Sequence, residues 1–300
     1  MLFLKKYMKV NVIYNTTDAP HGGGNQFLKA LKGCFQDLGF LASEDAADVF
    51  LFNSHHNIDR VMRLKNKYPQ RTFVHRVDGP MRLYNDISDA RDHVVYEANN
   101  AIANGTVFQS EWSKNANLKM GMKINNPSSV IINGIDDSIF YAPKDKKSSN
   151  KIRIISASFS PNLKKGFNVY KFLDDNLDFN HFEYCFAGNS PVNFKNIKNL
   201  GCLTSQQLAH KLRESDVFIT ASQKDPCSNS LIEAISCGLN VLALDDGGHT
   251  ELIKDPKCMF SSNEQLLDNL KKKNFKRPSA SFSVQASAQK YLGFFEELTT

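Results

Sequence analysis

The stretch SDVFITASQKDPCSNSLIEAISCG, residues 215–238, decides the fold class of this 300-residue chain. Its apolar run Val217–Thr220 is typical of a buried strand, and helical periodicity begins near Ser228–Ser230 after a polar loop. A strand, a loop and a helix in this order form half of a βαβ unit. Hydroxyl and amide side chains can cap such a helix. Its unpaired amides and positive dipole end also suit a diphosphate.

The same alternation of strand and helix patterns runs through the rest of the chain. Strands are expected over residues 9–14, 48–53, 72–75, 106–109 and 129–132, and again over 151–156, 182–187, 217–220 and 241–244. Helices are expected over residues 25–38, 59–68, 206–215 and 282–298. Alternating elements predict an α/β fold with parallel sheets.

A polar, proline-containing stretch, residues 142–150, separates the two series of elements and is typical of a linker. We therefore predict two Rossmann-like domains, residues 1–142 and 151–280, facing a cleft at the carboxyl ends of their strands. Residues 281–300 are expected to form a helix that crosses back to the first domain.

The composition narrows the functional classes. The hydrophobic fraction of 41% and the charged fraction of 23% are ordinary for a globular α/β protein. No apolar run is as long as a membrane span requires. Lysines interrupt the apolar start, which argues against a signal peptide. The six cysteines are scattered without any CxxC pair, which argues against metal or disulfide roles. We expect reduced thiols and a cytoplasmic protein. The net charge of +6 favours only weak peripheral contact with anionic membranes, and no aromatic and basic interleaving points to nucleic acid.

Two carboxylates flank the expected helix start. Asp225 lies before it, and Glu233 lies about one turn inside it, so both can face one ligand. Glu233 could accept paired hydrogen bonds from a ribose diol, and Asp225 could hold sugar hydroxyls. On these residues alone, a capped surface helix with solvated acids is an equal alternative.

This segment resembles the signature of the GT-B glycosyltransferases of family 4, in which two glutamates are separated by seven residues. Asp225 to Glu233 has this spacing, with Asp in place of the first Glu. Residues 234–243 and 247–253 continue the family pattern, as does VIINGID over 130–136 with Phe140 after it. The resemblance spans both expected domains and implies sugar transfer with retention of configuration.

The resemblance implies roles for further positions. Lys165, before Gly166, matches the lysine that holds the donor diphosphate, with Lys164 beside it; Ser158 and Ser160 occupy the region where the family has an arginine. His75, expected to end a strand, and Asp78 match the first domain's contribution. The remaining donor-binding positions implied are Gly23, Gly24, Gly188, Cys202, Leu203, Ser228, Asn229, Ser230 and Leu231.

Two other site types fit less well. The glycine-rich turn His21–Asn25 fails the dinucleotide pattern, because Phe27 stands where the third glycine belongs. The acid pairs at 174–175 and 245–246 lack the intervening residue of a metal-binding DxD motif, and the adjacent His55 and His56 cannot face one side of a strand. No metal and no cofactor are expected.

The sequence therefore predicts a metal-independent, retaining glycosyltransferase with a UDP- or GDP-linked sugar donor. The acceptor is open among a lipid-linked sugar, a polysaccharide and a protein glycan. Two alternatives remain. One is a catalytically weak protein that binds or scaffolds sugar nucleotides, favoured by the absent arginine and by Asp225. The other is a sugar-nucleotide epimerase of the same fold.

Overall fold

The computed structural model describes residues 8–17, 19–145 and 149–300. The start of the chain, where no signal peptide is expected, lies partly outside these residues, as does the centre of the expected linker. Within the described ranges, no helix combines the length and apolar character that a membrane crossing requires.

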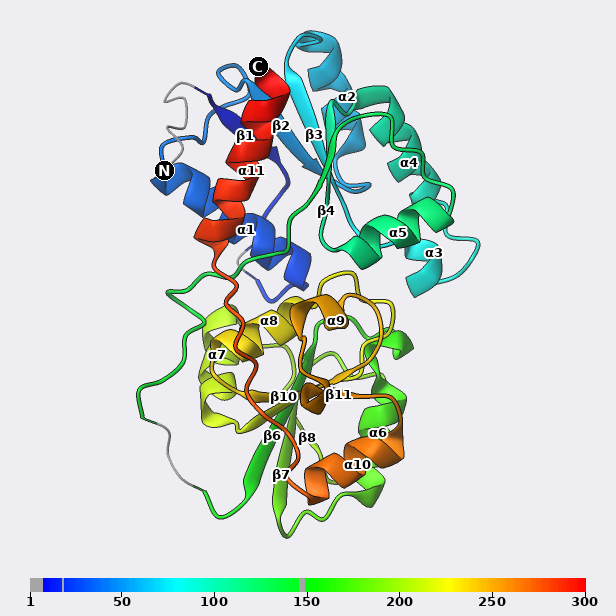
Figure 1. The fold of residues 1–300 in the computed structure, drawn as a ribbon, viewed down its shortest axis with the longest axis vertical. Coiled ribbons are helices and arrows are strands. Elements are labelled where there is room, and N and C mark those ends of the chain that lie inside the picture. The colour runs from blue at the N-terminus through cyan, green and yellow to red at the C-terminus, as the bar shows by residue number, and fades with distance from the viewer. Residues whose placement is uncertain (1–7, 18, 146–148) are drawn as a thin grey trace. The chain divides into compact units, whose positions relative to one another are not determined.

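The described residues form two parallel sheets (Figure 1). The first has the order β1-β2-β3-β4-β5, and its strands pair in parallel. They are β1 (Val10–Ile13), β2 (Val49–Asn53), β3 (Thr72–Val77), β4 (Gly105–Phe108) and β5 (Ser128–Val130). The associated helices are α1 (Gly23–Asp37), α2 (Ile58–Lys67), α3 (Met81–Tyr84), α4 (Arg91–Ile102), α5 (Glu111–Lys119) and α11 (Val284–Thr299).

Helices cover both faces of the first sheet because side chains alternate along its strands. In β2, Val49 and Leu51 join a core formed with α1 and α11, whereas Phe50 and Phe52 join a second core with α2 and α4. The last helix, α11, drawn in red in Figure 1, lies beside α1.

The second sheet has the order β11-β10-β9-β6-β7-β8. Its strands are β6 (Ile152–Ser158), β7 (Phe182–Gly188), β8 (Lys198–Asn199), β9 (Val217–Thr220), β10 (Asn240–Leu244) and β11 (Met259–Phe260). Its helices are η1 (Leu163–Lys165), α6 (Phe167–Asn176), α7 (Ser205–Glu214), α8 (Asn229–Ser236), α9 (His249–Leu252), η2 (Pro256–Cys258) and α10 (Asn263–Lys271). The chain leaves β6 toward β7 and β8, then returns to place β9 on the other side of β6. Such a reversal is a topological switch point, where open α/β sheets bind ligands beyond the carboxyl ends of the strands.

The chain divides into two compact units. The first contains the described residues up to Thr16, Phe27–Gly134 and Ser283–Thr300, and the second contains Thr17–Gln26 and Ile135–Phe282. Residues 135–142, expected in the first domain, belong to the second unit because Arg213 donates to the Ile139 carbonyl at 2.8 Å and stacks over Tyr141. The glycine-rich turn also belongs to the second unit.

The α/β prediction is confirmed, and each expected strand overlaps an observed one. One boundary matters for function. The strand expected over 72–75 continues to Val77, so His75 lies inside β3 and not at its end. Helices α4 and α5 were not predicted, since their sequences carry many polar residues and little apolar periodicity.

Gly134 tests how α11 joins the first unit. A Cβ at Gly134 would lie 2.5 Å from the carbonyl oxygen of Ser283 and 2.6 Å from Cα of Val284, so the backbone entering α11 must shift. We expect Gly134→Ala to destabilise the protein by about 2 kcal/mol in urea unfolding. Gly33→Ala, whose Cβ would meet no atom within 4 Å, is the matched control. Equal stability of the two variants would contradict this packing.

Candidate functional site

The start of α8 lies beyond the carboxyl end of β9, at the switch point of the second sheet. Ser228 is the N-cap residue of α8, yet in this described segment its side chain does not cap the helix. Its hydroxyl lies 3.4 Å from that of Ser230. The first-turn amides of Ser230 and Leu231 therefore suit an anionic ligand, as the positive end of a helix does generally.

Lys165 and Asp225 form a shielded ion pair beside this helix start. The Lys165 Nζ lies 2.8 Å from Oδ2 of Asp225, and the side chains are 22% and 9% exposed. The Ser222 hydroxyl donates to the same oxygen at 3.1 Å, and the Cys227 amide donates to Oδ1 at 3.2 Å. Burial acts to raise the pKa of Asp225, but Lys165, then His249 and the hydrogen bonds, hold it below its usual value. Asp225 is therefore ionised at neutral pH.

The position of Lys165 depends on a close approach between two loops. Gly166 has φ +91°, and a Cβ there would lie 2.4 Å from the Cβ of Ala221. The Gln223 amide donates to the Lys164 carbonyl at 2.7 Å. The loop after β6 and the loop after β9 are thus held together by backbone contacts that only a glycine at 166 permits.

Glu233 has the opposite electrostatic setting. The residue is 5% exposed, and burial raises the pKa of its carboxyl to about 8. This carboxyl group forms no hydrogen bond or ion pair with the side chains or backbone of the described residues. A buried carboxyl without a partner is costly in a folded protein unless a ligand supplies the hydrogen bonds.

The glycine-rich turn packs against the start of α8 within the second unit. A Cβ at Gly23 would lie 2.5 Å from Nδ2 of Asn229, so only glycine fits there, whereas a Cβ at Gly24 would meet no atom within 4 Å. The buried Asn25 closes the turn, since its side-chain amide accepts from the Thr17 amide and donates to the Thr17 carbonyl, both at 3.0 Å. The starts of α1 and α8 are thus adjacent.

Gly188 and Cys202 come together at the ends of β7 and β8. Gly188 has φ +127°, and a Cβ there would lie 1.8 Å from the Ser158 carbonyl oxygen. Its amide donates to the Gly201 carbonyl at 2.7 Å. Cys202 is exposed, and its Sγ lies 3.0 Å from Oδ1 of Asn189. Leu203 follows, half-buried. The close approach of the Ser158 carbonyl therefore requires glycine at position 188, independently of any ligand contact.

His75, which the family resemblance places in the active site, is a buried residue of the first unit. His75 is 0% exposed, stacks on Phe52 with ring centroids 4.2 Å apart, and lies 3.0 Å from the Ser54 carbonyl through Nε2. Asn99 donates to its Nδ1 at 3.2 Å. Burial lowers the pKa of His75 to about 4, against smaller contributions from Ser54 and Asp78. It is a neutral interior residue with both nitrogens occupied.

Asp78 follows β3 and neutralises a buried arginine. Arg76 is 0% exposed, and its Nη1 lies 2.9 Å from Oδ1 of Asp78, whose side chain is 21% exposed. Arg76 also donates to Asn133 at 2.9 Å, and Gln109 donates to Asp78. Asp78 thus has a structural task, while part of its carboxylate faces solvent.

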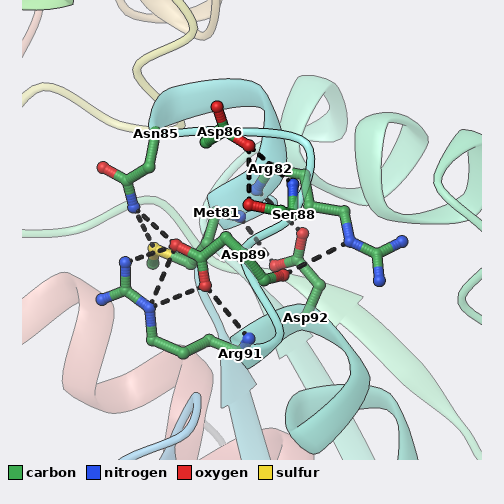
Figure 2. A network of polar contacts seen from close by, with 8 residues as sticks. All are labelled: Met81, Arg82, Asn85, Asp86, Ser88, Asp89, Arg91 and Asp92. Carbon is green, nitrogen blue, oxygen red and sulfur yellow. Dashed lines mark hydrogen bonds and ion pairs between the residues drawn. The ribbon is translucent and has the colours of Figure 1, made fainter.

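The segment after Asp78 is held by a network of polar contacts (Figure 2). Asp92 accepts from the amides of Met81 and Arg82 at 2.7 and 3.0 Å, and Asp89 accepts from Arg91 and Asn85. The hydrogen bond from the Arg91 guanidinium holds the pKa of Asp89 well below its usual range. Burial acts to raise this pKa but is the smaller effect. These contacts fix the connection between β3 and α4.

Two residues near the site were not identified from sequence. Asn25 shapes the glycine-rich turn, and His249 is a buried residue close to Asp225. An asparagine after three glycines is a weak signal for loop closure. For His249, the sequence offers no sign of burial. Among the described residues, no group of three or more His, Cys, Asp or Glu side chains is placed to hold a metal ion.

Comparison with known proteins finds one family model that matches part of the chain. Residues 192–273 match the family model described as glycosyl transferases group 1. The matched segment lies inside the second unit. The matched segment contains Asp225, the start of α8 and Glu233, and the resemblance noted from the sequence is thereby confirmed. None of the curated protein sequences matches this chain significantly.

Solved structures of glycosyltransferases share the fold at low sequence identity. Sucrose-phosphate synthase from Thermosynechococcus elongatus is 13% identical with a TM-score of 0.77, covering 97% of this chain and 99% of that one. HepE from Anabaena, solved with UDP and glucose, is 14% identical with a TM-score of 0.74, covering 97% and 100%. A UDP-forming trehalose-phosphate synthase from Burkholderia xenovorans is 11% identical, with a TM-score of 0.61 and coverage of 91% and 79%.

Glu233 gives a stability prediction with a definite sign. Its native pKa of about 8 exceeds the ordinary value of 4.5, so the folded protein keeps a proton that the unfolded chain releases between these pH values. Stability contributed by this group therefore falls as pH rises from 4.5 to 8. We expect Glu233→Gln to gain stability over the parent protein by about 1 kcal/mol per pH unit in this window, measured by urea unfolding. The exposed Glu297→Gln is the control; a gap independent of pH would refute the burial argument.

Proposed function

We propose that this protein is a retaining glycosyltransferase that binds a nucleotide diphosphate sugar in its second unit and transfers the sugar to an acceptor hydroxyl. The observation that carries the proposal is the buried Glu233 carboxyl, which has no partner among the described residues, together with the start of α8 and the Lys165–Asp225 pair in the same unit. An acceptor, a helix N-terminus and a cation suit different parts of such a donor.

The residues have distinct proposed roles. The first-turn amides of α8, Ser228 to Leu231, and Lys165 bind the diphosphate, with Lys164 next to it. Their positive charge offsets the charge that builds up as the diphosphate leaves, so transfer needs no metal ion. Glu233, once ionised, accepts two hydrogen bonds from the ribose diol. Asp225 accepts from sugar hydroxyls, and the Gly188 to Leu203 region holds the base.

A uridine nucleotide is the donor we favour. HepE, which shares the fold over the whole chain, was solved with UDP-glucose. The exposed Cys202 and the backbone at Gly201 provide small polar groups for a nucleobase edge. In the first unit, His75 and Asp78 remain proposed contributors only through the family resemblance, and part of the Asp78 carboxylate is exposed. We place the reaction in the cytoplasm, with a lipid-linked, polysaccharide or protein glycan acceptor.

The central experiment measures donor use by two variants. Lys165→Ala removes a cation that acts on the leaving diphosphate, so we expect kcat to fall about 100-fold to 1000-fold. Glu233→Ala removes hydrogen bonds to the ribose, so we expect about tenfold to 100-fold weaker donor binding. Calorimetry with UDP- and GDP-sugars and product analysis with mixed acceptors supply the two readouts. Unchanged turnover in both variants would reject this site.

Gly24 offers a test that leaves the protein surface otherwise intact. A methyl group at Gly24 meets no protein atom within 4 Å and projects beside the start of α1, where we propose that the donor lies. We expect Gly24→Ala to fold normally and to bind UDP-glucose about tenfold more weakly. Gly33→Ala in the same helix, also unobstructed, should bind as the parent protein does. Equal affinity of the two variants would argue against a donor at this helix end.

A catalytically weak binding protein is the second candidate. In the region where the family has an arginine, the Ser158 hydroxyl donates instead to the Ser160 carbonyl at 2.9 Å. Without that arginine, one positive charge fewer stabilises the leaving diphosphate, so transfer would be slower. Tight UDP-glucose binding, with neither transfer nor hydrolysis over hours, would select this candidate. Interconversion of the sugar in the donor alone would instead identify an epimerase.

A further inference from the structure

His249 is a buried histidine with one ring nitrogen unused. It begins the short helix α9 and is 0% exposed. Its Nδ1 lies 2.9 Å from the Leu244 carbonyl and donates to it. Its Nε2 is buried and has no hydrogen-bond partner among the described residues. Holding the Leu244 carbonyl would occupy only Nδ1, so that structural role leaves the second nitrogen unexplained.

The loop that carries His249 is anchored to Asp225. The Gly248 amide donates to the Asp225 carbonyl at 2.8 Å. Gly247 has φ +65°, and a Cβ there would lie 2.6 Å from the same oxygen, so a side chain at 247 would force the loops apart. This backbone contact holds the imidazole in the electrostatic field of the Lys165–Asp225 pair.

The charged groups facing His249 come from three segments. Asp225 lies on the loop after β9, Lys165 on η1, and Asp246 on the histidine's own loop, where Lys224 pairs with it at 2.9 Å. Burial lowers the pKa of His249, and Asp225 opposes that effect. The free protein therefore holds a neutral imidazole next to an ion pair whose charges cancel.

A diphosphate donor would upset this balance, because it brings two negative charges to Lys165. The Lys165 ammonium would then be shared between Asp225 and the diphosphate. Asp225 would remain buried and ionised with a weaker counter-charge. The unused Nε2 of His249, which lies in the electrostatic field of Asp225, could carry another counter-charge, since a protonated imidazole donates from both ring nitrogens.

We infer that His249 is a positioning residue that takes up a proton from solvent when a nucleotide diphosphate sugar binds, and so becomes the second counter-charge of Asp225. This inference rests on the proposed donor site. It assigns His249 the task of keeping the Asp225 carboxylate ionised and oriented toward the sugar while Lys165 turns to the diphosphate. His249 itself contacts no substrate.

Histidine-selective NMR of the intact protein tests the protonation directly. The eight histidines are labelled with ¹⁵N, and the His249 signals are assigned by their loss in His249→Asn. UDP-glucose is the probe because its diphosphate has no terminal phosphate that titrates near neutral pH. At pH 7, we expect the ring to change from a neutral to a protonated ¹⁵N pattern at saturating UDP-glucose. A ring that stays neutral would overturn the inference.

Affinity as a function of pH gives a second readout that a purely structural role would not move. Glu233 must lose a proton for the donor to bind, and His249 must gain one, so the two changes offset each other and log Kd for the parent protein should be nearly independent of pH around pH 7. In Glu233→Gln, only the proton uptake remains, so binding should weaken as pH rises. In His249→Asn, which keeps a donor for the Leu244 carbonyl, only the proton release remains, so binding should tighten as pH rises toward 8, and it should be at least threefold weaker than in the parent protein at pH 7.

The outcomes separate this inference from the donor site itself. Absence of UDP-glucose binding to the parent protein would reject both. Binding with an identical pH profile in the parent protein and His249→Asn would reject the inference alone. His210→Asn, at an exposed histidine paired with Glu214, is the control and should retain the parent profile.

Discussion

The shielded ion pair between Lys165 and Asp225 is the interaction on which the second unit's candidate site depends. It joins the loop after β6 to the loop after β9, the two strands between which the sheet reverses its order. Removing one partner of a shielded pair leaves an uncompensated charge, which is more damaging than removing both. Gly166 and the Gln223 amide bring the loops close enough for the pair to form. Local backbone geometry and long-range electrostatics therefore specify the same arrangement.

The two acids around α8 show how position alone sets their chemistry. Asp225 has a lysine, a hydroxyl and an amide as partners, and its carboxylate is ionised. Glu233 is buried without a partner among the described residues, and its carboxyl keeps its proton near neutral pH. An unmet carboxyl reduces the stability of the free protein. If Glu233 binds a ribose diol as proposed, the same carboxyl that lowers stability would supply affinity, so stability and binding would make opposite demands on this position.

Local sequence patterns predicted the strands and the start of α8, because apolar runs and helix-start residues act over short distances. The family resemblance also pointed to Lys165, Asp225 and Glu233, and the structure places Lys165 and Asp225 in one ion pair. The end of β3 could not be found in this way. Arg76 follows the expected strand end at His75, yet it lies buried within β3, where it contacts Asp78 and Asn133 while Gln109 contacts Asp78. Asn133 and Gln109 come from distant segments. His249 escaped for the same reason, since its environment is created by loops far apart in sequence.

The position of α11 in the chain has a consequence for synthesis. This helix supplies Tyr291, Leu292 and Phe295 to the core of the first unit, although it follows the whole of the second. During translation, one apolar face of the first sheet stays uncovered until α11 leaves the ribosome. The second unit, apart from its glycine-rich turn, is contiguous and can complete its core earlier. The unit encoded second is thus equipped to fold first, and the nascent chain depends on protection of the earlier strands in the interval.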